Sequence, residues 1–275
     1  MFPTHSFHKF FGLLVAAFFS CMLSRAQVPG QWTFMKGSDT LDFIGNYGVR
    51  GLPDTTNMPP SAYEAVEWTD AYGNFWLYGG EFSQKIGSDL WKFSPNSNTW
   101  TWINGHNKLE QKPVYGTRTV PDTNNTPGER AVCYSWADKT GSLWLYGGLG
   151  YYDTGTATFG YSDLWKYYIA ANVWTWLKGD TSFATTYHYG TKYVEDTANK
   201  PPANIEIGVC WTDKTNNLWL LDNKGCMWRY KIATNNWTWM SGDTTTFTPP
   251  AVYGTKGLPD SANTPGHSVL DYTVG

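Results

Sequence analysis

"SDLWKFSPNSNTWTW", residues 88–102, decides the fold because it returns twice farther along the chain. Its counterparts are "SDLWKYYIAANVWTW" at 162–176 and "GCMWRYKIATNNWTW" at 225–239. In each copy the side chains alternate with a period of two, and aromatic and β-branched residues are bounded by Gly, Asn, Asp and Pro. The stretch therefore predicts a pair of strands that belongs to a repeated unit.

The repeat extends well beyond this pair of strands. Each unit opens at a Tyr-Gly pair and runs through a polar loop to Trp-x-Asp and then to a strand such as "FWLYGG" (75–80) or "LWLYGG" (143–148). The pairs begin at Tyr47, Tyr115, Tyr189 and Tyr253. We expect four short strands per unit, at roughly 62–69, 74–79, 89–94 and 99–103 in the first. A single sheet of this kind has two apolar faces, so the rings must pack between stacked sheets, as in a β-propeller.

Short motifs within the repeat resemble the kelch repeat of the galactose-oxidase-like and kelch propellers. The matching residues are Gly79-Gly80, Asp89-Leu90-Trp91 and Asn98-Thr99-Trp100, with Gly147-Gly148, Asp163-Leu164-Trp165 and Asn172-Val173-Trp174 in the second unit. The long loops look like those of kelch proteins secreted by bacteria. The third unit departs from the pattern, with Asp222-Asn223 in place of Gly-Gly and Cys226 in place of Asp.

The repeat boundaries predict an all-β chain with an incomplete ring. Three complete four-stranded blades are expected at about 47–104, 115–179 and 189–242, and a partial blade at 253–275. "QWTFMKGSD" (31–39) matches "TWTWINGHN" from 99, so residues 27 onward should begin with an orphan fourth strand. Closed propellers need about four to eight blades. Open blade faces therefore predict self-association.

The N-terminus predicts export. Lys9 precedes an apolar run that ends at Ser24-Arg25-Ala26, which is typical of a signal peptide cleaved after residue 26. Removal of residues 1–26 takes away Lys9 and Arg25 and no acid, so the formal net charge of −3 becomes −5. That charge argues against nucleic acid as a partner. No later run is long enough to span a membrane, so we expect a secreted protein, extracellular or at the cell surface.

Three cysteines follow the predicted cleavage site: Cys133, Cys210 and Cys226. Their odd number leaves at least one thiol outside any disulfide within the chain. A Cys210–Cys226 bridge stays open as an alternative, because spacing alone does not fix its geometry.

The segment "GLGYYDTGTATFGYS" (148–162) is the most individual loop, since the first unit has only "GEFSQKIGS" there. Loops on a rigid scaffold gather binding residues, and aromatic rings with polar edges suit a sugar or a protein partner. The alternative is that this insertion has no function. The candidate ligand-binding residues are Tyr151, Tyr152, Asp153, Phe159 and Tyr161.

Catalytic chemistry has little support in the sequence. Recurring acids permit a calcium site, but one carboxylate per loop is a turn pattern, and side chains that bond their own turns are the preferred explanation. These acids are Asp54, Asp122, Asp196 and Asp260 in the long loops, and Asp70, Asp138 and Asp213 after the first strand. Galactose oxidase holds copper with tyrosines and histidines and has a Tyr-Cys cross-link. His106, His188 and His267 fall at different places in the repeat, so we do not extend that activity, or any other cofactor, to this chain.

The sequence thus favours a secreted kelch-like module that binds a glycan or a protein at the cell surface. Two alternatives remain: an oxidase-like or glycan-active enzyme, and a non-functional truncated product of a longer propeller gene.

Overall fold

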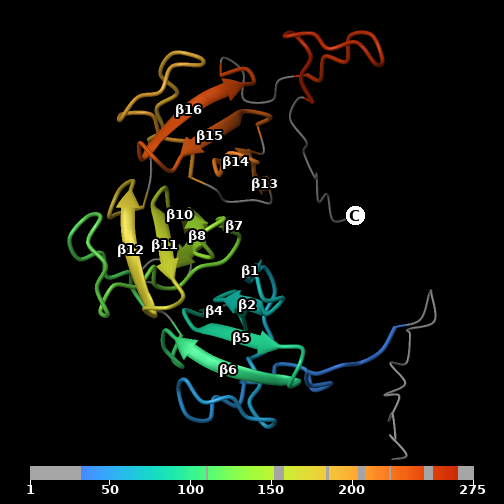
Figure 1. Ribbon diagram of the computed structural model, residues 1–275, viewed down its shortest axis with the longest axis vertical. Coiled ribbons are helices and arrows are strands. Elements are labelled where there is room, and N and C mark those ends of the chain that lie inside the picture. Colours follow the sequence, from blue (N-terminus) through green and yellow to red (C-terminus); the bar gives the residue numbers. More distant parts are fainter. Residues whose placement is uncertain are drawn as a thin grey trace, which may run out of the picture. The chain divides into compact units, whose positions relative to one another are not determined.

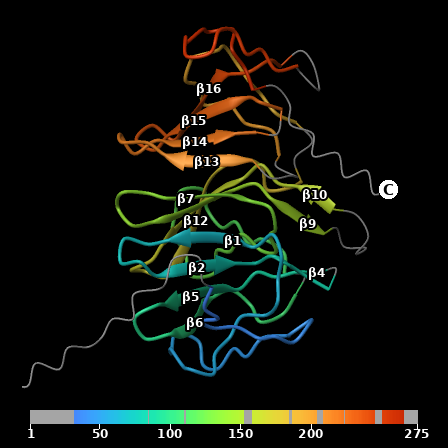
Figure 2. The same cartoon turned by 90° about the vertical axis from the view of Figure 1, so that its right-hand side faces the viewer.

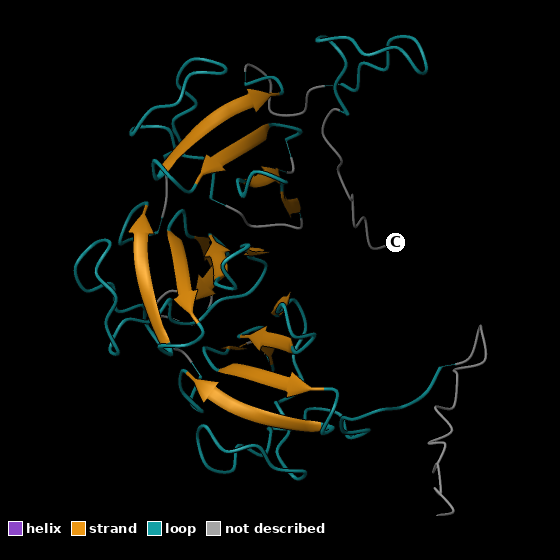
Figure 3. Cartoon of the chain, in the orientation of Figure 1, coloured by secondary structure: helices purple, strands orange, loops and turns teal. Residues whose placement is uncertain are grey.

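The computed structural model describes residues 32–83, 85–109, 111–151, 158–183, 186–203, 208–222, 224–244 and 250–265. Within these ranges the chain contains strands and loops but no helix (Figure 3). It divides into two compact units, Met1–Met35 and Lys36–Gly275, and all the strands lie in the second. The predicted signal peptide, 1–26, lies outside the described residues.

The described residues of the second unit form three four-stranded antiparallel sheets, each built from consecutive stretches of chain (Figure 1). The first sheet has the order β1 (Val66–Thr69), β2 (Phe75–Tyr78), β5 (Leu90–Ser94), β6 (Thr99–Asn104). The second has β7 (Tyr134–Ala137), β8 (Leu143–Tyr146), β11 (Leu164–Tyr168), β12 (Val173–Lys178). The third has β13 (Val209–Thr212), β14 (Leu218–Leu221), β15 (Met227–Lys231), β16 (Asn236–Ser241).

Two short hairpins accompany these sheets. β3 (Glu81–Phe82) pairs with β4 (Lys85–Ile86), and β9 (Leu149–Tyr151) pairs with β10 (Thr158–Gly160). Both lie between the second and third strands of their sheet, so the second hairpin holds part of the predicted ligand-binding loop.

The turn between the first two strands of each sheet is held by an aspartate. Asp70 Oδ1 accepts hydrogen bonds from the backbone N–H of Tyr72 (2.9 Å) and Asn74 (3.0 Å), and its Oδ2 accepts one from Trp76 Nε1 (2.9 Å). Asp138 and Asp213 make the same bonds in their own turns. These carboxylates therefore define the turn and fix a core tryptophan, as the turn interpretation predicts.

The three sheets are stacked one on the next (Figure 2), and aromatic rings fill the spaces between them. Trp76 packs on Tyr167 with ring centroids 5.9 Å apart, and one repeat later Trp144 packs on Tyr230 at 5.7 Å. The second sheet is covered on both sides, and all four residues of β8 are buried. The rings thus pack between sheets as the sequence predicts.

The long polar loop that precedes each sheet packs on the outer strand of that same sheet. In the second unit, Asn125 Nδ2 donates to the carbonyls of Val120 and Trp174, both at 3.1 Å, and so joins the loop to β12. Asn57 and Asn199 repeat this arrangement on β6 and β16. The extra length of these units therefore covers the outer strands.

The predicted incomplete ring is confirmed for the described residues. β7 lies against both β1 and β13, and the three sheets do not close on themselves. Residues 32–39, expected as an orphan strand, carry no strand assignment. A strand needs a neighbour to pair its backbone groups, and no ladder forms on these residues. Cys133, Cys210 and Cys226 are free, so the Cys210–Cys226 bridge does not form.

Candidate functional site

The predicted ligand-binding loop is only partly described. Tyr151 ends β9 and Phe159 lies in β10, whereas Tyr152 and Asp153 lie outside the described residues. Tyr161 is buried, with 4% of its surface exposed. Its ring packs against Phe183 with centroids 4.7 Å apart. The end of the predicted loop therefore contacts the segment that leads into the third sheet.

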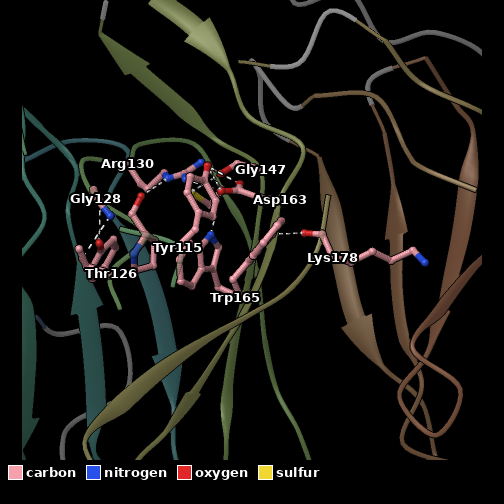
Figure 4. A network of polar contacts seen from close by, with 12 residues as sticks. Tyr115, Thr126, Gly128, Arg130, Gly147, Asp163, Trp165 and Lys178 are labelled. Carbon is pink, nitrogen blue, oxygen red and sulfur yellow. Dashed lines mark hydrogen bonds and ion pairs between the residues drawn. The ribbon is translucent and has the colours of Figure 1, made fainter. Parts of the chain in front are cut away.

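Tyr161 also covers a buried ion pair. The Arg130 guanidinium lies 3.4 Å from the centre of the Tyr161 ring and donates to both carboxylate oxygens of Asp163, at 3.0 and 2.6 Å (Figure 4). Tyr115 Oη and Trp165 Nε1 donate to the same carboxylate, each at 2.8 Å. Arg130 and Asp163 are fully buried, so this network is part of the core and holds the second sheet together.

The other two sheets fill the position of Asp163 differently. In the first, Asp89 accepts from Tyr47 Oη (2.7 Å) and Trp91 Nε1 (2.6 Å), and burial raises its pKa. In the third, Cys226 stands there. Because only the second sheet pairs this carboxylate with an arginine, the Arg130 network is an addition to the repeat.

A hollow of about 420 Å³ opens beside this network, where the end of β12 meets the loop that enters the third sheet. Ser162, the neighbour of Tyr161, borders it. Its other lining residues are Arg118, Lys178, Gly179, Asp180, Thr186, Tyr187, His188, Thr197, Ala198, Asn199, Lys200 and Trp237. We call this space the cationic hollow, after Arg118, Lys178 and Lys200.

Arg118 and Lys178 bring two positive charges to one side of the cationic hollow. The exposed Arg118 guanidinium lies 4.3 Å from the centre of the Trp176 ring and donates to the Gly179 carbonyl at 3.2 Å. Lys178 points from the buried network toward the third sheet, and its Nζ donates to three neutral oxygens, those of Thr197 (2.9 Å), Asn235 (3.2 Å) and Asn236 (3.2 Å) (Figure 4).

Burial lowers the pKa of Lys178, and the positive charge of Arg118 lowers it further. Two like charges close together repel each other, so an anion bound between them would relieve that repulsion. Lys200 differs, because its Nζ pairs with Asp180 Oδ2 at 2.5 Å and also reaches Thr186 Oγ1 at 3.1 Å.

The junction between the first two sheets shows which of these charges the repeat itself requires. Arg50 corresponds to Arg118 and makes the same contacts, with the Trp102 ring and the Gly105 carbonyl. The other basic residues have neutral, non-basic counterparts in the first junction: Asn104 stands for Lys178, Val114 for His188 and Thr126 for Lys200. His188 and Lys200 are therefore specific to this junction. Lys178 is not, because Lys36 occupies the same position before the first sheet and its Nζ donates to the Thr55 carbonyl, the counterpart of the Thr197 carbonyl.

The rim of the cationic hollow carries an aromatic ring. Tyr187 is half exposed and meets Tyr189 edge to face, with centroids 5.4 Å apart. Lys224 Nζ lies 5.0 Å from the centre of the Tyr187 ring. Proline, Pro113, occupies the position of Tyr187 in the first junction, so this ring is also an addition to the repeat.

The cationic hollow was not predicted from the sequence. Its signal lies in two departures from the repeat, at His188 and Lys200, and in Lys178, which replaces the Asn104 of the first junction. These differences become visible only when the positions beside the strands are compared between units. Each departure alone resembles ordinary surface variation. These side chains come together only because the loop before the third sheet folds back over β16, and the sequence of a single segment does not show this.

The described residues contain no group of three or more His, Cys, Asp or Glu side chains placed to hold a metal ion. The recurring long-loop carboxylates bond their own turns instead; Asp122 Oδ1, for example, accepts from Asn124 N at 2.8 Å. No helix in the described part of the chain is long and apolar enough to cross a membrane.

Solved structures, but no protein families or curated proteins, resemble this chain. No protein-family model matches the chain, and no curated protein matches it. A solved structure titled "Structure of YjhT" aligns with a TM-score of 0.42 and 12% sequence identity, over 69% of this chain and 55% of the other. The chain thus spans about half the length of that protein.

Proposed function

We propose that this chain is an exported binding module of the kelch-like β-propeller type, and that the cationic hollow binds an acidic oligosaccharide. The observation that supports this most directly is the replacement of neutral residues of the first junction by Lys178, His188 and Lys200 in the second. The first junction packs with neutral residues, Asn104, Val114 and Thr126, at these positions. Their concentration in an otherwise acidic chain favours an anionic ligand.

A uronic acid residue suits the chemistry of the cationic hollow. Its carboxylate would meet the exposed Arg118 guanidinium, whose planar N–H groups match a carboxylate in geometry. Lys178 adds a charge whose hydrogen-bond partners are neutral, although the Asp196 carboxylate lies near enough to stabilise it. Tyr187 offers an aromatic surface at the rim for the apolar face of a sugar ring.

The test compares two arginines that make the same local contacts. Arg118→Ala and Arg50→Ala each remove a cation stacked on a tryptophan and bonded to a glycine carbonyl, but only Arg118 borders the cationic hollow. Binding of uronic-acid oligosaccharides would be measured by titration calorimetry against neutral oligosaccharides of equal length. We expect Arg118→Ala to weaken binding about tenfold, as the loss of one charged contact predicts, with Arg50→Ala unchanged.

Lys200→Thr and Lys178→Asn, which place the residues of the first junction in the second, should also weaken binding. Affinity should fall as salt is raised, because exposed charges are screened. Equal binding of neutral oligosaccharides, or equal effects of Arg118→Ala and Arg50→Ala, would refute the proposal.

A further inference from the structure

Every sheet of this chain has two faces of different composition. We name them by the second strand of each sheet, whose side chains alternate between the faces. The tryptophan face carries Trp76 and Tyr78 in β2, Trp144 and Tyr146 in β8, and Trp219 and Leu221 in β14. The leucine face carries Phe75 and Leu77, Leu143 and Leu145, and Leu218 and Leu220.

Both junctions within the chain use the same pairing, the tryptophan face of one sheet against the leucine face of the next. The same hydrogen bond crosses both. Trp68 Nε1 donates to the Trp144 carbonyl at 2.9 Å, and Trp136 Nε1 donates to the Trp219 carbonyl at 2.8 Å. One type of interface is therefore built twice.

The two faces left over are the two halves of that same interface. On the leucine face of the first sheet, Phe75 is 49% exposed, whereas its counterparts Leu143 and Leu218 are fully buried. On the tryptophan side of the third sheet, Trp211 is 39% exposed, whereas its counterpart Trp136 is 3% exposed. The indole N–H of Trp211 has no hydrogen-bond partner among the described residues, although it stacks on Trp219 at 5.7 Å.

The open leucine face is also hollowed. A space of about 460 Å³ lies on the first sheet between the exposed Phe75 and the outer-strand Trp100, with Leu77 beneath it. At the inner junctions the tryptophan face of the neighbouring sheet covers the corresponding residues. Aromatic side chains line much of this hollow, together with Glu67 and Thr69, and a tryptophan face of the same repeat fits such a surface.

We propose that the open tryptophan face of the third sheet docks on the open leucine face of the first sheet of a second copy of this chain. Trp211 Nε1 then donates to the Trp76 carbonyl of the other copy, which continues the series begun by Trp68 and Trp136. Two copies supply six sheets, within the four to eight of closed propellers. A second copy fits the open leucine face because both inner junctions already pack a tryptophan face against a leucine face.

One residue departs from the series and limits the affinity. At the inner junctions Ser135 Oγ donates to the Glu67 carbonyl at 3.0 Å, and Cys210 Sγ donates to the Ser135 carbonyl at 3.1 Å. The first sheet has Glu67 at that position, and an ionised carboxylate has no proton to donate to the Cys210 carbonyl of a second copy. Glu67→Ser restores the donor that the second sheet uses.

The experiment is light scattering on a sizing column over a hundredfold range of concentration, with the full chain and three variants. The wild type should change from monomer to dimer as concentration rises. Trp211→Ser should raise the dimer dissociation constant at least tenfold, and Glu67→Ser should lower it. Leu52→Ser, which alters an exposed apolar residue on a loop outside both faces, should leave it unchanged.

Trp211 is partly exposed, so its variant should fold, and its thermal transition is recorded to confirm this. A wild type that stays monomeric throughout, or that associates equally well with serine at 211, would overturn the proposal. A dimer weakened by Glu67→Ser would overturn it as well, since the two faces would then meet through another contact.

Discussion

Arg130 carries a positive charge in the middle of an apolar sheet stack. Its guanidinium bonds both oxygens of Asp163 and also the carbonyls of Pro127 (2.9 Å) and Gly147 (3.2 Å). The removal of one partner leaves the other charge buried without compensation, which costs far more than the pair itself contributes. The pair is therefore a sensitive point of the second sheet.

Arg130→Met should lower the free energy of unfolding by about 3–5 kcal/mol, because Asp163 is then left as an unpaired buried carboxylate. The double variant with Asp163→Asn should lose clearly less. Urea unfolding followed by tryptophan fluorescence measures both. Asp89→Asn serves as the control in the first sheet, where burial already raises the pKa of this acid and no arginine is lost. A loss below about 1 kcal/mol for Arg130→Met would contradict the argument.

Asp222 should make the free energy of unfolding fall as pH rises, whereas most paired carboxylates make it rise. Burial raises its pKa to about 6, although its Oδ1 accepts from the backbone N–H of Cys226 at 2.8 Å. Between roughly pH 4 and pH 6 the unfolded chain releases this proton while the folded chain keeps it, so stability falls as pH rises. Above the folded pKa the loss is complete, about 3 kcal/mol in size.

Asp222→Asn removes this titration and keeps the acceptor oxygen. The free energies of unfolding of wild type and variant should therefore be similar near pH 4 and diverge in favour of asparagine as pH rises toward neutrality. Urea titrations at about one-unit pH steps measure the difference. A difference that stays constant with pH would show that Asp222 ionises normally in the folded chain.

The long loops act at the scale of elements, as covers for the outer strands. Asn125 is buried, and its side-chain N–H groups bond a loop carbonyl and a strand carbonyl at once. Gly116, with a φ of +59°, lies so close to Asn125 Oδ1 that a Cβ there would fall 2.2 Å from it. The glycine of the Tyr-Gly pair therefore leaves the space that this asparagine needs to reach the strand.

Asn125→Ala should destabilise the chain by about 1–3 kcal/mol, since the buried Trp174 carbonyl and the partly buried bond to the Val120 carbonyl both lose their donor. Amide exchange in residues 116–126 should accelerate more than elsewhere, as followed by mass spectrometry. Asn124→Ala is the matched control, because the Asn124 side chain is exposed. Equal effects of the two alanines would mean that the loop is held by other contacts.

The strands were predictable from the sequence, whereas the contacts between elements were not. Alternation in "FWLY" and "TWTW" predicts β2 and β6 closely, since pattern and burial share one period. The first strand was predicted from residue 62 but begins at Val66, because Tyr63 bridges to Glu81 instead. Nothing near Arg130 marks its partner, which lies 33 residues away.

At the scale of the whole molecule, stability should differ between the sheets, because stacked repeats support only their neighbours. The second sheet has a neighbour on each side, and β8 is buried at every residue, whereas Phe75 in β2 and Trp211 in β13 are exposed. Opening the second sheet therefore exposes two apolar junctions, and opening either outer sheet exposes one.

Hydrogen exchange at low protein concentration should accordingly be slowest in β8 and β11 and faster in β2 and β14. Trp136→Phe, which removes the hydrogen bond to the Trp219 carbonyl, should accelerate exchange in the third sheet and leave the first unchanged. If exchange showed the same free energy of opening in all three sheets, the stack would unfold as a single unit. The contacts between sheets would then have to be more stable than the contacts within each sheet.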